Sequence, residues 1–343
     1  MSLDTCGVSY WAKKTPQKTA IKAGDKSLTF KGWDEQINCA ATALLRKGVG
    51  VGDRVALIVD EPIASMTLML ALFRLGAVAC PVNPTFPDVY CASRLAQLDC
   101  ALVIVEHPSP SLPTALPLSE IITDSAAKAA VLESVPLDPD RPALIIFTSG
   151  STGEPKAAVL SVENFRQNAR LSNSNITLEP GDVWLLSLPL YHVAGLGILF
   201  RCLEAGATIA VPAPDETVDT VAASGEVTHL SLVARQLAQM LTTQESRKVL
   251  SHAKAILLGG GAIPDDLIAA ACSRRLPLFT TYGMTEMATQ VTTTWPGADS
   301  ETLRSSGRPQ QAGIIRITAD GEIEVNGPSR FLGYWEDASI TKP

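Results

Sequence analysis

The sequence lacks several features that mark common classes of protein. Its seven cysteines include no Cys-x-x-Cys pair, and an odd, scattered set is typical of reduced thiols rather than of a disulfide framework. No run of basic residues occurs and the net charge is -7, so the composition does not favour nucleic-acid binding. With 46% hydrophobic and 18% charged residues, the composition is that of an ordinary globular protein.

Long apolar segments are also missing. The longest, Ile63 to Phe73, contains Ser and Thr and ends at Arg74, so it is too short to span a bilayer. Residues Met1 to Ala20 are of mixed polarity and hold no apolar core of a signal peptide. We therefore expect a cytoplasmic protein without a membrane span, and the length of 343 residues predicts more than one folding unit.

Strand-like apolar runs alternate with helical periodicities along most of the chain. Residues 54–59 and 77–82 predict buried strands, and residues 33–47 and 63–75 predict helices. The same alternation continues beyond residue 143. This pattern predicts an α/β fold with mostly parallel sheets.

Composition divides the chain into three expected parts. A first α/β subdomain covers residues 1–140, because Leu137 to Pro142 combines charged residues with prolines and has the character of a joint. A second α/β subdomain covers residues 141–295 and contains a glycine-rich loop. Residues 296–343, where short strands and turns replace the alternation, predict a small β subdomain.

The glycine-rich loop is the stretch Thr-Ser-Gly-Ser-Thr-Gly-Glu-Pro-Lys at residues 148–156, and it follows the apolar run 143–147. Glycines let a backbone turn sharply and present its N–H groups to an anion, while the hydroxyls and Lys156 add donors and charge. A flexible surface loop is the alternative that composition alone favours. A Walker loop is excluded, because Pro155 precedes Lys156 and the required glycine spacing is absent.

This stretch resembles, nearly letter for letter, the phosphate-binding signature of the acyl-adenylate-forming superfamily, which includes acyl-CoA synthetases, luciferases and peptide-synthetase adenylation domains. Three further segments resemble motifs of that family in the same order: Leu-Pro-Leu-Tyr-His-Val-Ala-Gly at 188–195, Leu-Leu-Gly-Gly-Gly-Ala-Ile-Pro at 257–264 and Thr-Tyr-Gly-Met-Thr-Glu at 281–286. The resemblance implies the large N-terminal part of such an enzyme. We expect the C-terminal lid domain that supplies the adenylating lysine to be absent from this chain, which alone should be poorly active.

The resemblance also implies a role for each motif. In the family the phosphate loop and the second glycine turn hold ATP, an aromatic residue stacks on adenine, and a glutamate helps to hold Mg²⁺. The residues implied to bind ATP are Thr148, Ser149, Gly150, Ser151, Thr152, Gly153, Lys156, Gly259, Gly260, Gly261, Thr281, Tyr282, Gly283, Met284 and Thr285. Those implied to act in catalysis are Lys156, Thr152, Glu286 and His192, with Glu286 and Thr152 at the metal.

Within the superfamily, segments 184–195, 198–207, 231–237 and 257–264 resemble most closely the ligases that join coenzyme A to o-succinylbenzoate in menaquinone biosynthesis. A departure is Ala234-Arg235, where we expect a proline after Ser-Leu-Val. The resemblance implies two steps, in which the carboxylate attacks the α-phosphate of MgATP and the CoA thiolate then displaces AMP. A ligase for another aryl or fatty acid, and a non-catalytic ATP- or acyl-binding module, remain open, as does a homo-oligomer.

Residues expected at the acid substrate are His192, Gly195, Arg201, Ser231 and Thr289. A lone histidine after a strand is more often structural, but the family places one beside the substrate carboxylate, and imidazole suits that position. Arg201 interrupts the otherwise apolar segment 196–203, and a buried guanidinium needs an anion. That anion is either Glu204, three residues along the helix, or a carboxylate of the substrate.

Overall fold

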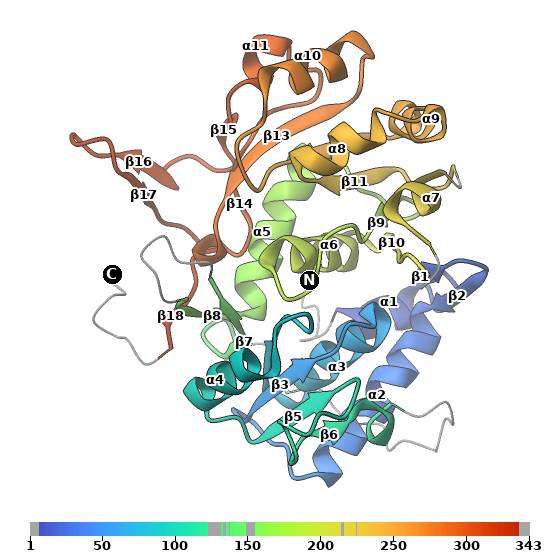
Figure 1. Ribbon diagram of the computed structural model, residues 1–343, viewed down its shortest axis with the longest axis vertical. Coiled ribbons are helices and arrows are strands. Elements are labelled where there is room, and N and C mark those ends of the chain that lie inside the picture. Colours follow the sequence, from blue (N-terminus) through green and yellow to red (C-terminus); the bar gives the residue numbers. More distant parts are fainter. Residues whose placement is uncertain are drawn as a thin grey trace. The chain divides into compact units, whose positions relative to one another are not determined.

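The computed structural model describes residues 7–122, 132, 135–136, 138–148, 155–213, 216–223 and 225–335. The chain divides into two compact units that interleave along the sequence (Figure 1). Unit 1 takes the described residues of Met1–Lys18, Thr29–Glu163 and Phe331–Pro343, and unit 2 takes those of Thr19–Leu28 and Asn164–Arg330. None of the helices in the described part of the chain is both long and apolar enough to cross a membrane.

Unit 1 is built on a seven-stranded sheet with the order β18-β8-β7-β4-β3-β5-β6. Strands β7, β4, β3, β5 and β6 are parallel, and at one edge β8 pairs antiparallel with both β7 and β18. Its elements are α1 (Val8–Lys14), α2 (Phe30–Arg46), β3 (Arg54–Ile58), α3 (Pro62–Leu75), β4 (Val78–Pro81), α4 (Asp88–Leu98), β5 (Leu102–Val105), β6 (Leu116–Pro117), η1 (Leu118–Glu120), β7 (Pro142–Phe147), β8 (Ala157–Ser161) and β18 (Gly333–Tyr334).

Unit 2 is built on a nine-stranded sheet with the order β15-β14-β13-β12-β11-β9-β10-β1-β2, and a separate two-stranded sheet joins β16 to β17. Strands β1, β10, β9, β11, β12 and β13 are parallel. Its elements are β1 (Thr19–Ala23), β2 (Lys26–Thr29), α5 (Val162–Asn175), β9 (Val183–Leu185), α6 (Val193–Ala205), β10 (Thr208–Ala210), α7 (Val218–Ala223), β11 (His229–Leu232), α8 (Ala234–Met240), α9 (Gln244–His252), β12 (Ala255–Leu258), α10 (Asp265–Ser273), β13 (Leu278–Gly283), η2 (Thr285–Met287), β14 (Gln290–Thr293), α11 (Ser300–Leu303), β15 (Arg308–Pro309), β16 (Ile315–Ile317) and β17 (Ile323–Val325).

The prediction of an α/β fold with mostly parallel sheets is confirmed, but the observed division differs from the expected boundaries. β7 pairs in parallel with β4, so residues 142–161 complete the sheet of unit 1 and do not start a new subdomain at residue 141. Within residues 296–343, β16 and β17 do form a small sheet of their own. However, β15 extends the large sheet of unit 2, and β18 joins unit 1. Pairing between strands distant in sequence therefore overrides the local change in composition.

Helix α6 is largely buried within unit 2. Every residue from Gly195 to Leu203 is buried, as expected for a segment that is apolar on all sides. A hydrophobic core of unit 2 joins strand residues such as Leu185, Leu230 and Ile256 to helix residues such as Leu237.

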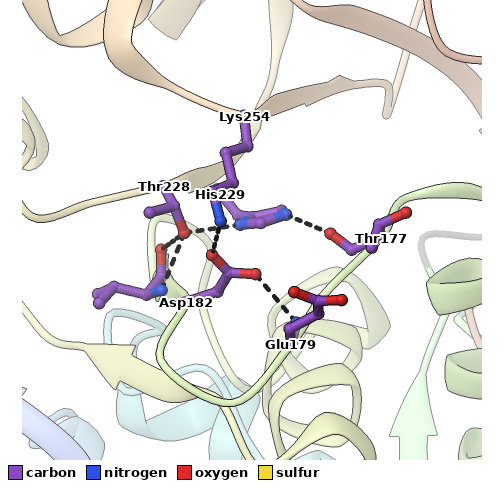
Figure 2. A network of polar contacts seen from close by, with 7 residues as sticks. Thr177, Glu179, Asp182, Thr228, His229 and Lys254 are labelled. Atoms are coloured by element: carbon purple, nitrogen blue, oxygen red, sulfur yellow. Dashed lines mark hydrogen bonds and ion pairs between the residues drawn. The ribbon is translucent and has the colours of Figure 1, made fainter.

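Because β9, β11 and β12 are parallel, their amino ends lie at one edge of the sheet and their carboxyl ends at the other. Figure 2 shows the polar network at the amino edge. Lys254 Nζ lies 2.6 Å from Asp182 Oδ1, and the backbone N–H of Glu179 donates to the other carboxylate oxygen of Asp182 at 2.9 Å. Asp182 is only 3% exposed, and desolvation, which would raise its pKa, is outweighed by these donors, so the pKa of this carboxyl is lowered.

His229 occupies the same edge and is completely buried. Its Nε2 lies 3.0 Å from the carbonyl oxygen of Thr177, so this nitrogen carries a proton and donates. Its Nδ1 lies 2.8 Å from the hydroxyl of Thr228 and accepts from it in the neutral ring. Burial lowers the pKa of His229 below its usual value, which keeps the ring neutral.

The buried neutral histidine predicts a stability that depends on pH. The folded-state pKa of His229 is lower than the unfolded value near 6.5, so the stabilisation is complete above that pH and is lost as pH falls through it. His192, whose pKa burial also lowers, contributes with the same sign. When the pH falls from about 7 to 5, the unfolding free energy of the parent should decrease. We expect the decrease in His229→Asn to be smaller by about 1 kcal/mol.

Denaturant unfolding at a series of pH values measures this difference. His252→Asn replaces an exposed histidine of the same unit and serves as the control. Equal pH slopes for the parent and His229→Asn would contradict the assignment of a neutral, buried His229.

Candidate active site

A cavity of about 700 Å³ opens at the carboxyl edge of the sheet in unit 2. The segments that follow β9, β11, β12 and β13 form its walls together with α6, as expected where parallel strands end. It brings together nine of the residues predicted from the sequence: His192, Arg201, Ser231, Gly259, Gly260, Thr281, Gly283, Met284 and Thr289. The motifs at 188–195, 257–264 and 281–286 therefore share one site.

Other predicted residues lie beside this cavity or elsewhere. Gly195, Gly261, Tyr282, Thr285 and Glu286 belong to the same segments but do not line it. Thr148 and Lys156 belong to unit 1, and Ser149, Gly150, Ser151, Thr152 and Gly153 lie outside the described residues.

In unit 1, Thr148 and Lys156 flank the loop that the sequence predicts to bind phosphate. They follow β7 and precede β8, and the backbone N–H of Thr148 donates to the carbonyl oxygen of Lys156 at 2.8 Å. This bond brings the two ends of the loop together. Lys156 Nζ lies 5.1 Å from the centre of the Tyr334 ring, where the π-face attracts the ammonium group.

His192 precedes α6 directly and lies at the wall of the cavity. It is extended, with φ of -119° and ψ of 146°, and no hydrogen bond from its side chain caps the helix. The ring is therefore not used to hold α6. Partial burial lowers the pKa of His192, so the neutral imidazole predominates near neutral pH.

Arg201 comes from the buried part of α6 and lines the cavity, although it is only 2% exposed. Nε donates to Ser172 Oγ at 2.9 Å and Nη2 donates to Gln290 Oε1 at 2.9 Å. The guanidinium carbon lies 5.1 Å from the centre of the Trp184 ring. Burial lowers the pKa of Arg201 to about 10, so the group stays charged at neutral pH.

The expected alternative partner of Arg201, Glu204, is engaged elsewhere. Glu204 Oε1 accepts from Arg170 Nε at 2.7 Å, and Arg166 Nε lies 3.8 Å from the other carboxylate oxygen. Both arginines come from α5, which packs along this face of α6. Among the described residues no carboxylate pairs with Arg201, so its charge is met only by neutral groups and an aromatic ring.

Gly197 makes room for this arrangement, and sequence reasoning missed it. A Cβ at this position would lie 2.7 Å from Thr289 Cγ2 and 3.1 Å from Arg201 Nη2. Such contacts are shorter than van der Waals distances, so any side chain here would displace the guanidinium. The signal was present in the sequence, because Gly197 lies four residues before Arg201 on one face of the helix.

The glycine turn after β12 is similarly free of side chains. Gly260 has φ of +85°, a conformation that residues with a side chain rarely adopt, and a Cβ at Gly261 would meet nothing within 4 Å. The turn thus presents exposed backbone beside the cavity. This arrangement fits the predicted contact with the flat edge of a purine.

The segment after β13 offers a hydroxyl and a carboxylate that could contact a metal-bound nucleotide. Thr285 and Glu286 start the short turn η2, and both are half-buried. Mg²⁺ is usually held by one or two carboxylates together with substrate phosphates and waters, and a hydroxyl beside a carboxylate fits that mode. Within the described residues, no cluster of three or more His, Cys, Asp and Glu side chains offers a metal site made of protein alone.

A match to a protein-family model defines the class of protein. The chain belongs to the AMP-binding enzyme family, whose model matches residues 8–335. The prediction drawn from the four motifs, that this is an acyl-adenylate-forming enzyme, is thereby confirmed.

Two similar proteins in this class are named for the same substrate. The 2-succinylbenzoate–CoA ligase of Salmonella typhimurium is 32% identical, over 96% of this chain and 69% of its own length. The o-succinylbenzoate CoA synthetase MenE of Bacillus subtilis, solved with the acyl-adenylate intermediate OSB-AMP, is 26% identical with a TM-score of 0.88 over 98% of this chain and 72% of its own. The structure of the same enzyme with ATP and magnesium ion is 26% identical, with a TM-score of 0.87 over 97% of this chain and 72% of its own.

The close approach at Gly197 yields a direct test of the Arg201 environment. Gly197→Ala adds one methyl group against Thr289 and Arg201, and we expect it to lower the unfolding free energy by about 1–3 kcal/mol because the buried groups must move apart. Denaturant unfolding measures the loss. Gly261→Ala, where the added methyl meets open space, should stay within about 0.5 kcal/mol of the parent. A Gly197→Ala protein as stable as this control would show that Arg201 and Thr289 are not held in place by packing.

Proposed function

We propose that this chain is an ATP-dependent acid–CoA ligase that adenylates 2-succinylbenzoate and then forms its CoA thioester, as in menaquinone biosynthesis. The observation that carries this proposal is Arg201, a buried cation at the wall of the cavity with no acidic partner among the described residues. The names of the relatives support the same substrate.

A dicarboxylic acid explains why such a cation is retained. A buried, unpaired guanidinium is costly, and a carboxylate that enters the cavity relieves this cost. One carboxylate of 2-succinylbenzoate must react, whereas the other stays unchanged and needs a permanent cation to hold it. Arg201 supplies that cation, and its fork of N–H donors suits a carboxylate better than an ammonium group does.

Groups at the wall of the cavity and beside it support the reacting end of the acid. In the first step, a carboxylate oxygen attacks the α-phosphorus of ATP and pyrophosphate leaves with the bonding electrons. This step depends on in-line positioning and on neutralisation of charge more than on proton transfer. The neutral imidazole of His192 donates a hydrogen bond to the carboxylate without removing its charge, and Thr285 offers a hydroxyl to the phosphoryl group. In the second step the CoA thiolate attacks the acyl carbon and AMP leaves.

Nucleotide and metal are assigned to the neighbouring segments. We propose that the backbone at Gly259, Gly260 and Gly261 and the ring of Tyr282 hold adenine, and that Glu286 holds Mg²⁺. When bound, the metal supplies positive charge to the phosphates. In unit 1, Thr148, Lys156 and the loop between them are proposed to bind phosphate, with Thr152 at the metal. The use of ATP and CoA also supports the proposed cytoplasmic location.

A ligase for an acid with a single carboxylate is less well supported by this site. Such a substrate would leave Arg201 without an anion when the cavity is filled. A non-catalytic binding module would likewise not require the hydrogen-bond donors, His192 and Thr285, that are proposed to contact the reacting groups.

The function is tested first with Arg201. Lysine keeps the charge but loses the bidentate fork, and we expect Arg201→Lys to weaken binding of 2-succinylbenzoate about tenfold to a hundredfold. Two analogues are compared by calorimetry: benzoylpropionate, which lacks the ring carboxylate, and ortho-butanoylbenzoate, which lacks the chain carboxylate. The analogue without the carboxylate held by Arg201 should bind parent and variant alike.

Arg170→Lys is the matched control, because Arg170 pairs with Glu204 and does not line the cavity. If Arg201→Lys weakens both analogues equally, Arg201 has a structural role. Failure of the parent to bind 2-succinylbenzoate more tightly than either analogue would refute the proposed substrate.

The metal assignment is tested with Glu286→Gln, which keeps the shape of the side chain and removes the charge that a hard cation prefers. We expect MgATP to bind about tenfold more weakly, whereas the affinity for 2-succinylbenzoate should change less than about twofold. Calorimetry with MgATP and with ATP in the presence of a chelator separates the metal from the nucleotide. Unchanged MgATP binding by a folded variant would remove Glu286 from the metal site.

A further inference from the structure

A second arginine of the cavity, Arg235, is not explained by the fold. Arg235 lies in the first turn of α8, just after β11, in the pair Ala234-Arg235 where we expected a proline after Ser-Leu-Val. Its side chain is exposed and lines the same cavity as Arg201. No hydrogen bond or ion pair joins this side chain to another residue in the described part of the chain.

The local electrostatics do not favour a cation at this place. The first turn of α8 contains no acidic residue, and the amino end of a helix carries partial positive charge, which repels a cation. The described residues that line the cavity include no Asp or Glu. Arg235 and Arg201 therefore give the cavity two positive charges that the described wall does not balance.

The neighbouring residue shows that the backbone at Arg235 is fixed. Gln236 Nε2 donates to the carbonyl oxygen of Ser187 at 3.0 Å, and the backbone N–H of Val233 donates to Gln236 Oε1 at 3.0 Å. These two bonds attach the first turn of α8 to the ends of β9 and β11. Arg235 is consequently held beside the cavity, even though its own side chain makes no bond to the described protein.

We propose that Arg235 is a specificity-determining residue, which attracts the carboxylate that reacts while Arg201 holds the carboxylate that does not. The proposal rests on the function proposed above, in which this cavity takes the acid. Two cations on different elements match the two negative charges of a dicarboxylate. The match persists during the first step, because the carboxylate charge is replaced by the single negative charge of the phosphoryl group in the acyl-adenylate.

The two arginines differ in exposure, and this gives them different physical signatures. Arg201 is desolvated, so its attraction for a carboxylate is strong and little affected by salt. Arg235 is exposed, so its attraction is weaker and screened by salt. Salt dependence therefore separates the two contributions in the same protein.

The experiment compares the full chain with Arg235→Gln, Arg235→Lys and the control Arg274→Gln, an exposed arginine of unit 2 that does not line the cavity. Affinities for 2-succinylbenzoate, benzoylpropionate and ortho-butanoylbenzoate are measured by calorimetry at low salt and at about 0.5 M salt. We expect Arg235→Gln to weaken 2-succinylbenzoate binding about threefold to tenfold at low salt and less than about twofold at high salt. Arg235→Lys and Arg274→Gln should stay close to the parent.

The analogues decide which carboxylate is recognised. Arg235→Gln should weaken only the analogue that Arg201→Lys leaves unaffected, because the two residues meet opposite ends of the acid. If both variants affect the same analogue, or if Arg235→Gln behaves like Arg274→Gln, the proposal for Arg235 is overturned. That outcome differs from failure of the proposed function, in which the parent itself shows no preference for the dicarboxylate.

Discussion

The burial of one guanidinium without an acidic partner among the described residues is the constraint to which the site of unit 2 is adapted. Around Arg201 the protein places a hydroxyl, an amide oxygen and the face of an indole, which satisfy donors without cancelling the charge. A carboxylate in the same place would be better for stability, but it would neutralise the cavity. Gly197 contributes to the same arrangement, because the absence of a side chain leaves space for the guanidinium of Arg201. Neutral partners thus keep the positive potential available for a ligand.

The parallel sheet separates this site from the acidic groups that would interfere with it. At the amino ends of the strands, Asp182 and Lys254 form an ion pair, and His229 stays neutral by burial. At the carboxyl ends, the described cavity wall contains cations, amides, hydroxyls and glycines but no acid. On α6 itself, Glu204 is drawn to two arginines of α5 and away from Arg201.

Sequence reasoning predicted the features that depend on neighbours along the chain. The alternation of strands and helices, the all-round burial of α6 and the glycine turn after β12 are encoded by periodicity and by residue type within short segments. The pairing of Glu204 with Arg170 was not predictable in this way, because the two residues lie 34 positions apart and meet only when α5 packs on α6. The addition of β7 to the sheet of unit 1 has the same origin. Arg235 was visible as a departure from the family pattern, but its significance depends on a cavity wall assembled from four separate segments.

The interleaving of the two units has a consequence for how the chain is made. β18 pairs with β8, and the indole N–H of Trp335 donates to the carbonyl oxygen of Gln97 at 3.1 Å. The edge of unit 1 is therefore completed by residues that leave the ribosome only after all of unit 2 has been synthesised. Until then, the edge of β8 that later receives β18 has no partner from its own unit and offers a surface to other chains. We therefore expect that chaperones bind unit 1 during translation, because its synthesis begins first and is completed last.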